Sequence, residues 1–450
     1  MKDDLRDPET SVATLANGVR VLAIRQPHVE TVGVSVFVRS GSQHESTRLN
    51  GISHVVEHMA FKGTHDRDCQ QINLDAERLG ADVNAHTDKD HTAFQMSGLA
   101  RDAGHFVEML GDIVRHCTFP EAELERERQV ILHEFLEDED DALSTAYKLY
   151  DKTCFGAHPI GQPVIGTRRN IERFTREDLL EYVQRQYTGA NTIVGIAGAI
   201  DPQAMLRAAE ATFADLPAGT PNTIETPAYF GGIASRRQSG CSQTHVVLGY
   251  PIPSLRDDDP AGLVAAALFG EGMSSPLMDQ IRERRGLAYY AACTAEEREL
   301  CGLFSIEATT MPEHLDELFI EVTRLLAAQA EHIDPVGLER ARNQILVRLL
   351  RDRERPLRRL EDAAQDLYIR GRVRSRAELT ARVHDVDADR LCAAFARLLE
   401  MPPTIAIAGK VGKGLNERVL EILGQRPAAV PKGRRALGSR TRHRARVATL

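Results

Sequence analysis

Two histidines and a glutamate stand close together in the segment His54-Val55-Val56-Glu57-His58. On a helix, His54 and His58 lie on the same face, one turn apart. Two imidazoles at this spacing can hold one metal ion, and Glu57 can reach a water molecule on that ion. The order H-x-x-E-H is the reverse of the commoner H-E-x-x-H order of zinc-binding helices. The segment therefore predicts a metal-binding helix whose site must be completed from elsewhere in the chain.

A catalytic zinc site uses three protein ligands and leaves one position open. A candidate third ligand lies in segment 125–134, where Glu127 and Glu134 are seven residues apart and share one face of a predicted helix. A metal would account for both carboxylates, with Glu134 as a ligand and Glu127 as a carboxylate that orients a histidine. The alternative is an ordinary solvated helix, because the segment is rich in Glu and Arg. Other candidate ligands are His86, His91, His116 and His133.

Hydrophobic periodicity predicts the elements that position these residues. Segment 10–38 predicts strands, and the metal-binding helix follows and is closed by Gly63. Pro120 stands at a favoured first-turn position of a long helix that we predict over 121–149. A continuous apolar run at 192–198 predicts a buried strand.

The second half repeats this order after a segment rich in Pro, Gly, Thr and Ser at 216–239, which we interpret as a linker. Strand 404–409 corresponds to strand 192–198. Where the first half has the histidine pair, the second has an apolar helix at 259–269. One copy thus carries the chemistry, and the other keeps only the fold.

The sequence therefore predicts an α+β protein made of two homologous α+β units, each an antiparallel-rich sheet packed by helices. The predicted parts are an N-terminal metal-binding domain at 1–215, the linker, a homologous C-terminal domain without the metal motif at 240–425, and a basic, disordered tail at 426–450. A chain of 450 residues fits two domains of this size.

Composition limits the classes of partner. A net charge of −9 argues against nucleic acid as the main partner. No stretch has the roughly 18 uninterrupted apolar residues of a membrane helix, and the N-terminal residues are polar rather than those of a signal peptide. The seven cysteines contain no Cys-x-x-Cys pair and are typical of reduced thiols. We therefore expect a cytoplasmic protein that binds neither nucleic acid nor a membrane.

Further motifs stand in a recognisable order along the chain. They are Glu134, seventy-six residues after His58, then His158–Gly161, Ile165–Thr167, Gly272–Leu277 and Ile281–Tyr289. From about Thr14 to Gly409, the chain resembles the M16 peptidase family, whose metal motif is of the inverted type, and in particular its half-length, processing-peptidase-like bacterial members. The resemblance implies half of a clamshell chamber and one Zn²⁺ per chain.

The resemblance also implies roles for the residues of the first half. By it, zinc would be bound by His54, His58 and Glu134. Glu57 would be the general base of peptide hydrolysis, and Glu127 would be a carboxylate that orients a histidine ligand of the zinc ion.

Two further groups of residues gain roles from the resemblance. The strand with Asn84, Ala85 and His86 would bind an extended peptide through its backbone. Arg282 and Tyr289, seven residues apart in the second half, would stabilise a substrate carbonyl or the tetrahedral oxyanion.

The function implied by the resemblance is that of a zinc-dependent metalloendopeptidase acting on peptides or unfolded segments. Long family members carry four such units, whereas this chain has two, so a homodimer is expected, with the Arg282 and Tyr289 of one subunit facing the zinc of the other. A heterodimer with a related subunit is the alternative. Two other functions stay open: a non-catalytic scaffold like the core subunits of the respiratory bc1 complex, and a peptidase dedicated to one precursor peptide with a partner subunit.

Overall fold

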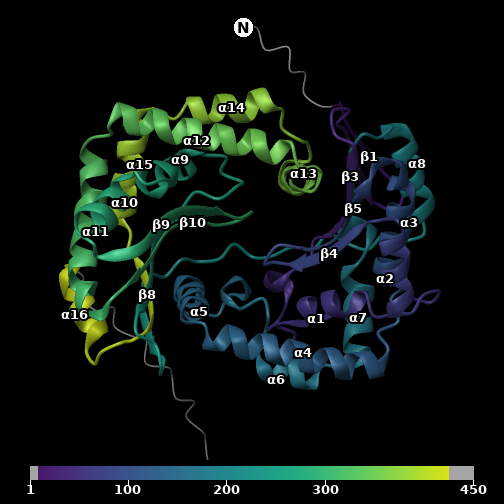
Figure 1. Cartoon of the computed structure of the whole chain (residues 1–450), viewed down its shortest axis with the longest axis horizontal. Coiled ribbons are helices and arrows are strands. Elements are labelled where there is room, and N and C mark those ends of the chain that lie inside the picture. Colours follow the sequence, from purple (N-terminus) through teal and green to yellow (C-terminus); the bar gives the residue numbers. More distant parts are fainter. Residues whose placement is uncertain (1–8, 425–450) are drawn as a thin grey trace, which may run out of the picture.

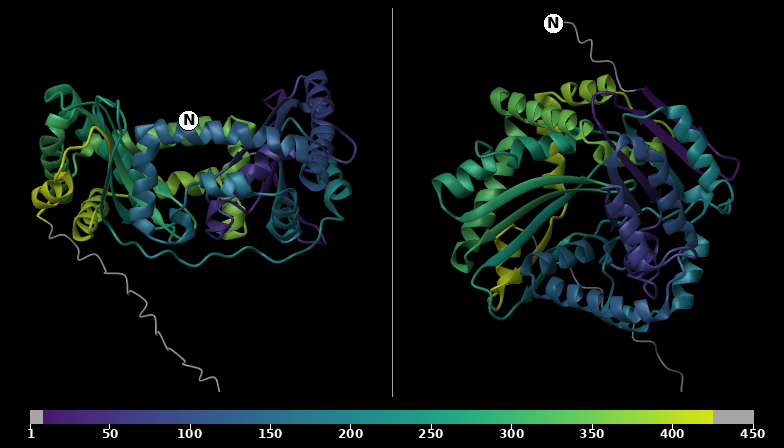
Figure 2. Two further views of the ribbon diagram at one scale, coloured as in Figure 1. Left: turned by 90° about the horizontal axis from the view of Figure 1, so that it is seen from below. Right: turned by 45° about the vertical axis from the view of Figure 1, so that its right-hand side comes forward.

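The computed structural model describes residues 9–424, and within that range it contains two β-sheets packed by helices (Figure 1). The predicted α+β class is thereby confirmed. The sheets lie on opposite sides of the molecule (Figures 1 and 2). Helices α4 (Glu121–Asp140) and α5 (Ala142–Phe155) run along one side between them, and α12 (Pro335–Arg353) and α13 (Pro356–Arg370) run along the other.

The first sheet has the strand order β1-β2-β6-β3-β5-β4. Its strands are β1 (Glu9–Thr14), β2 (Arg20–Arg25), β3 (Thr31–Val38), β4 (Asp82–Thr87), β5 (Thr92–Leu99) and β6 (Thr192–Gly198). Strands β2 and β6 pair in parallel, and all other neighbours are antiparallel. Strand β4 forms one edge, so one side of its backbone has no strand neighbour within residues 9–424.

The second sheet has the order β7-β11-β8-β10-β9. Its strands are β7 (Gly232–Arg237), β8 (Thr244–Ile252), β9 (Ala288–Glu297), β10 (Gly302–Thr310) and β11 (Thr404–Gly409). Here β7 and β11 are parallel and the other pairs antiparallel. Apart from β1, this pattern reproduces the first sheet strand for strand, and β9 occupies the edge that corresponds to β4.

Helices of the first half cover one face of the first sheet. The helices α1 (Ile52–Ala60), α2 (Cys69–Arg78), α3 (Ala103–His116) and α8 (Pro202–Phe213) pack on its strands, and α6 (Arg168–Arg173) and α7 (Arg176–Gln186) pack against α1. Phe106, Leu110 and Ile113 recur at helical spacing on α3 and are buried with Val34 and Val36 of β3. Short 3-10 turns connect the elements at Ser42–His44, Ala100–Asp102, Pro159–Gly161, Gly189–Asn191 and Pro312–His314.

The second half has its own set of helices. They are α9 (Ala261–Gly270), α10 (Pro276–Met278), the π-helical turn η5 (Asp279–Arg284), α11 (Leu315–Glu331), α14 (Arg376–His384), α15 (Ala388–Glu400) and α16 (Leu415–Ile422), besides α12 and α13. Helix α9 packs against β9 and α12, just as α1 packs against β4 and α4. Helix α9 is therefore the counterpart of α1, and its apolar side chains are buried in the core.

The helix predicted over 121–149 is two helices in the structure. Helix α4 ends at Asp140, and the Asp141 carboxylate accepts hydrogen bonds from the backbone N–H groups of Leu143 and Ser144. A side-chain cap of this kind starts a new helix and stops the preceding one. The chain turns at Asp141, and this turn directs α5 toward the second sheet.

Each half lends one helix to the other half's sheet. From the first half, α5 packs on β7, β8 and β11, and the Tyr150 hydroxyl lies 2.9 Å from the Ser305 hydroxyl. From the second half, α13 packs on β3 and β6, and the Tyr368 hydroxyl donates to the carbonyls of Phe37 and Asn191. The exchange covers the remaining face of each sheet and ties the halves together.

The connection between the halves is largely extended. Residues 217–231 contain no helix or strand, and Figure 2 shows this segment running along one side of the molecule. Within the segment predicted as linker, residues 232–237 form β7, because their backbone pairs with β11. The predicted tail at 426–450 lies outside the described residues. Among the helices described, none is long and apolar enough to cross a membrane.

Candidate metal centre

Helix α1 is fixed at its start by a buried acid. The Glu45 carboxylate accepts hydrogen bonds from the backbone N–H groups of Gly51 and Ser53, each at 2.8 Å. A carboxyl oxygen at this position accepts from donors that have no partner within the helix. The Ser53 hydroxyl lies 2.7 Å from the Tyr182 hydroxyl of α7. The helix that carries the histidines is therefore held at a defined position in the core.

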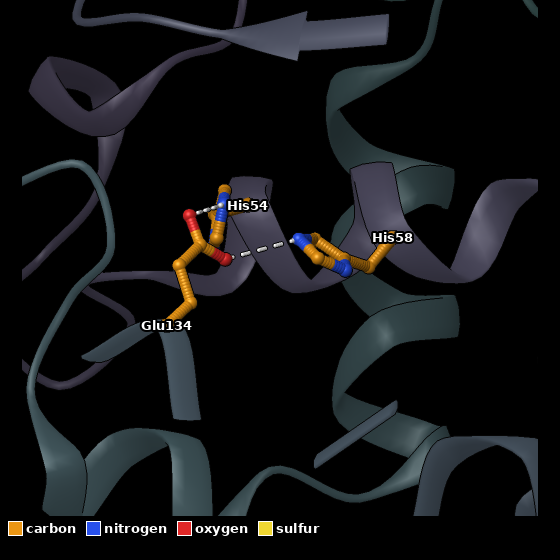
Figure 3. A group of neighbouring side chains, drawn as sticks. All are labelled: His54, His58 and Glu134. Atoms are coloured by element: carbon orange, nitrogen blue, oxygen red, sulfur yellow. Dashed lines mark ion pairs between the residues drawn. The ribbon is translucent and has the colours of Figure 1, made fainter. Parts of the chain in front are cut away.

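The side chains of His54, His58 and Glu134 meet where α4 crosses α1. The Glu134 carboxylate points between the two imidazoles (Figure 3), 3.5 Å from Nε2 of His54 and 3.4 Å from Nε2 of His58. One ligand atom from each residue lies within 4.8 Å of the others, and no other such group of three occurs in residues 9–424. Two imidazole nitrogens and a carboxylate are a donor set that suits zinc and leave a fourth position open. The residues present therefore fit a catalytic zinc ion.

Electrostatics within this group favour charge on the carboxylate. Hydrogen bonds from His54 and His58 hold the pKa of the Glu134 carboxyl far below its usual range. Burial alone would lower the pKa of His58, but Glu134 and Glu127 together raise it above the ordinary value. The site thus already pairs nitrogen donors with an anionic oxygen.

Glu127 lies behind His58, two turns before Glu134 on α4. Its side chain is buried, and Oε2 lies 3.2 Å from Nδ1 of His58. Oε1 lies 2.5 Å from the ammonium nitrogen of Lys62. A carboxylate at Nδ1 favours a proton on that nitrogen, so that Nε2 would be the atom available to bind a metal ion.

Glu57 opens onto the same pocket as His54 and Glu134. The pocket has a volume of about 460 Å³ and is lined by His54, Glu57, Glu134 and residues of β4 and α5. Tyr147 and Lys148 are among the α5 residues that line it, and the Tyr147 hydroxyl donates to Glu307 of β10 at 2.6 Å. The second half thus supports one wall of the pocket.

The edge strand β4 forms another wall. Ala85 and His86 line the pocket, whereas Asn84 does not. The backbone N–H of Asp88 donates to the carbonyl of His91, and alternation along an antiparallel ladder then turns the backbone of Asn84 and His86 toward β5. The N–H and C=O of Ala85 consequently face the open edge, where an added strand would pair.

Arg282 and Tyr289 lie in η5 and β9 of the second half. The guanidinium carbon of Arg282 is 5.1 Å from the centre of the Tyr289 ring, and Tyr289 is 78% exposed. The structure therefore brings these two residues to each other. It does not bring them to the metal-binding group of their own chain, since neither lines that pocket.

Other histidines considered as ligands have different surroundings. Nδ1 of His91 lies 3.4 Å from Oδ1 of Asp88, and Nδ1 of His116 lies 3.2 Å from Oδ1 of Asp112 on its own helix. His86 lines the pocket from β4. Lys62 was not predicted, because it lies beyond the end of α1 and its contact with Glu127 of α4 depends on how the two helices pack. Tyr147 and Lys148 were not predicted either, since their placement depends on the turn at Asp141.

The duplicated fold and the His-His-Glu group define a class, that of metallopeptidase-like proteins. A sequence model of the family described as insulinase (peptidase family M16) matches residues 20–168, and one described as the peptidase M16 inactive domain matches residues 173–345. The chain belongs to the M16 peptidase family, which confirms the resemblance drawn from its motifs.

Relatives extend over most of the chain. It is 29% identical to an uncharacterized zinc protease of Rickettsia bellii (strain RML369-C), over 89% of this chain and 97% of the relative. It is 30% identical to subunit 1 of the mitochondrial cytochrome b-c1 complex of Bos taurus, over 85% of this chain and 82% of the relative. The crystal structure of a protease from Helicobacter pylori superposes with a TM-score of 0.83, over 90% of this chain and 100% of that one. Because the two sequences are only 21% identical, this similarity concerns the fold alone.

Proposed function

We propose that this protein is a zinc-dependent metalloendopeptidase that hydrolyses peptides or unfolded segments held in an extended conformation. The observation that carries the proposal is the convergence of His54, His58 and Glu134 beside a pocket that His54, Glu134 and Glu57 line and that an open edge strand borders. The name of the Rickettsia relative, a zinc protease, supports the same chemistry.

In this proposal His54, His58 and Glu134 hold the zinc ion, and Glu127 orients His58. When bound, zinc supplies Lewis-acid chemistry that makes water acidic near neutral pH. Glu57 accepts a proton from the attacking water and then delivers it to the leaving amine. The substrate backbone pairs with β4 through the N–H and C=O of Ala85, so affinity depends little on side-chain identity.

We further propose that a second subunit completes the site. Arg282 and Tyr289 are suited to stabilise a substrate carbonyl or an oxyanion, yet they do not line the pocket of their own chain. A second copy would supply them in trans. A related partner chain is the alternative, and the bovine relative is itself named as a subunit of a complex.

Metal removal tests the activity itself. Digestion of a broad peptide library should be lost after treatment with a chelator, because the zinc ion supplies the Lewis-acid chemistry of the reaction. Addition of one equivalent of Zn²⁺ should restore it. Cleavage products are measured by mass spectrometry. Cleavage that persists in the chelator would contradict the proposal. A protein that binds zinc but cleaves nothing would favour the scaffold role suggested by the bovine relative, and cleavage confined to a single peptide would favour a dedicated peptidase.

Replacing Ala85 with proline tests strand addition. The substitution removes the N–H that faces the open edge, and we expect kcat/KM to fall about tenfold, the value of one or two lost hydrogen bonds. Val12→Pro is the matched control on the opposite edge of the same sheet. Its N–H also faces outward, since Leu15 and Val19 form a hydrogen-bonded pair. Equal activity of the Ala85→Pro and Val12→Pro variants would argue against substrate binding at β4.

A further inference from the structure

Lys62 lies two residues beyond the end of α1 and reaches across to α4. Its ammonium nitrogen is 2.5 Å from Oε1 of Glu127, and Oε2 of the same carboxylate is 3.2 Å from Nδ1 of His58. The Lys62 side chain is 24% exposed, and the Glu127 side chain is 11% exposed. Three side chains thus form a continuous series that begins at the protein surface and ends at a proposed zinc ligand.

The neighbouring arginines of α4 do not pair with the Glu127 carboxylate. Arg126 pairs with Glu123, and Arg128 bonds to the backbone carbonyls of Ile171 and Phe174. Within residues 9–424, Lys62 is the only lysine or arginine that forms an ion pair with Glu127. A carboxylate this buried is stable as an anion when it is paired and hydrogen-bonded.

The pairing also has a geometric consequence. With Oε1 held by Lys62, the carboxylate plane of Glu127 cannot rotate freely, and Oε2 stays directed at Nδ1 of His58. The imidazole is thereby held with Nε2 toward Glu134. Ligand orientation of this kind is what residues behind a metal ligand contribute to metal affinity.

The two histidines differ in how they are held. His54 is buried, and its Nδ1 has no hydrogen-bond partner in the described part of the chain, so core packing holds this ring. The side chain of His58 is more exposed, at 22%, and its Nδ1 depends on Glu127. At Nδ1, only the ring of His58 is oriented by a polar side chain, that of Glu127.

We propose that Lys62 is a positioning residue of the zinc site that acts through Glu127 to fix the ring of His58. The inference rests on the proposed function, because it takes His54, His58 and Glu134 as the zinc ligands. Lys62 itself touches neither the metal position nor the substrate pocket.

The test measures zinc affinity by competition with a chromogenic chelator. Lys62→Met keeps the aliphatic stem and removes the charge, and we expect the Kd for zinc to rise about tenfold or more. Lys62→Arg, which keeps the charge, should recover most of the affinity. Lys152→Met is the matched control, since Lys152 is an exposed lysine on α5. If Lys62→Met fails to fold, as judged by circular dichroism, Lys62→Gln replaces it.

A double substitution tests the route of the effect. In a Glu127→Gln background, Lys62→Met should change the zinc Kd little further, because both substitutions break the same series of contacts. Nitrogen NMR of the metal-free protein should show that His58 loses its fixed tautomer in Lys62→Met. Unchanged zinc affinity in Lys62→Met, or effects of the two substitutions that simply add, would overturn the inference. A wild-type protein that binds no zinc would instead overturn the proposed function.

Discussion

Replacing Glu57 with glutamine should abolish peptide cleavage while zinc remains bound. Glu57 lines the pocket together with His54 and Glu134 but does not belong to the group of His54, His58 and Glu134. Glutamine has nearly the same shape as glutamate and cannot accept the proton of the attacking water. A general base contributes roughly 10²–10⁴-fold to the rate, so kcat should fall by at least about a hundredfold. Turnover of a quenched peptide and zinc content by elemental analysis are the two measurements.

The control for this variant is Glu77→Gln, which makes the same chemical change at an exposed position on α2. It should cleave peptide as the wild type does and bind the same amount of zinc. If Glu57→Gln retains near-normal turnover, Glu57 is not the base. If it loses zinc together with activity, its role is structural.

Mixing two inactive variants should restore activity if the site is shared between subunits. In a Glu57→Gln and Arg282→Ala heterodimer, one of the two sites receives an intact Glu57 from one subunit and an intact Arg282 from the other. With random exchange of a homodimer, half of the dimers are mixed and half of their sites are complete, so about a quarter of wild-type activity is expected. The same experiment would leave activity near zero if each chain used its own Arg282.

A matched mixture separates rescue in trans from a general effect of mixing. Glu57→Gln and Glu134→Ala both lie in the first half, so no arrangement of their heterodimer has a complete site. This pair should stay inactive under conditions that restore the other pair. Subunit exchange is verified by co-purification of differently tagged chains. Exchange without recovery in the Glu57→Gln and Arg282→Ala mixture would contradict a site shared in trans.

Local spacing was enough to predict the elements nearest the proposed chemistry. The four-residue interval between His54 and His58 places both rings on one helix face, and the seven-residue interval between Glu127 and Glu134 does the same on α4. The duplication was also predictable, because apolar runs such as 192–198 and 404–409 mark equivalent central strands of the two sheets.

The turn at Asp141 was not predictable in the same way. The residues on both sides of it favour a helix, and one long helix over 121–149 satisfies their periodicity. The structure breaks this run because the Asp141 side chain caps α5, whose Tyr150 is buried against the second sheet. Packing of α5 on the other half's sheet, a contact between residues far apart in the chain, decides the geometry.

The sequence by itself determined which residue types could form the site and which helix faces they share, because those follow from the periodicity of a helix. Only the tertiary structure decided that α4 crosses α1 so that Glu134 meets His54 and His58, and that Lys62 joins Glu127 behind them. It also decided that Arg282 lies outside the pocket of its own chain. These relations depend on packing between elements distant in sequence, which no local spacing encodes.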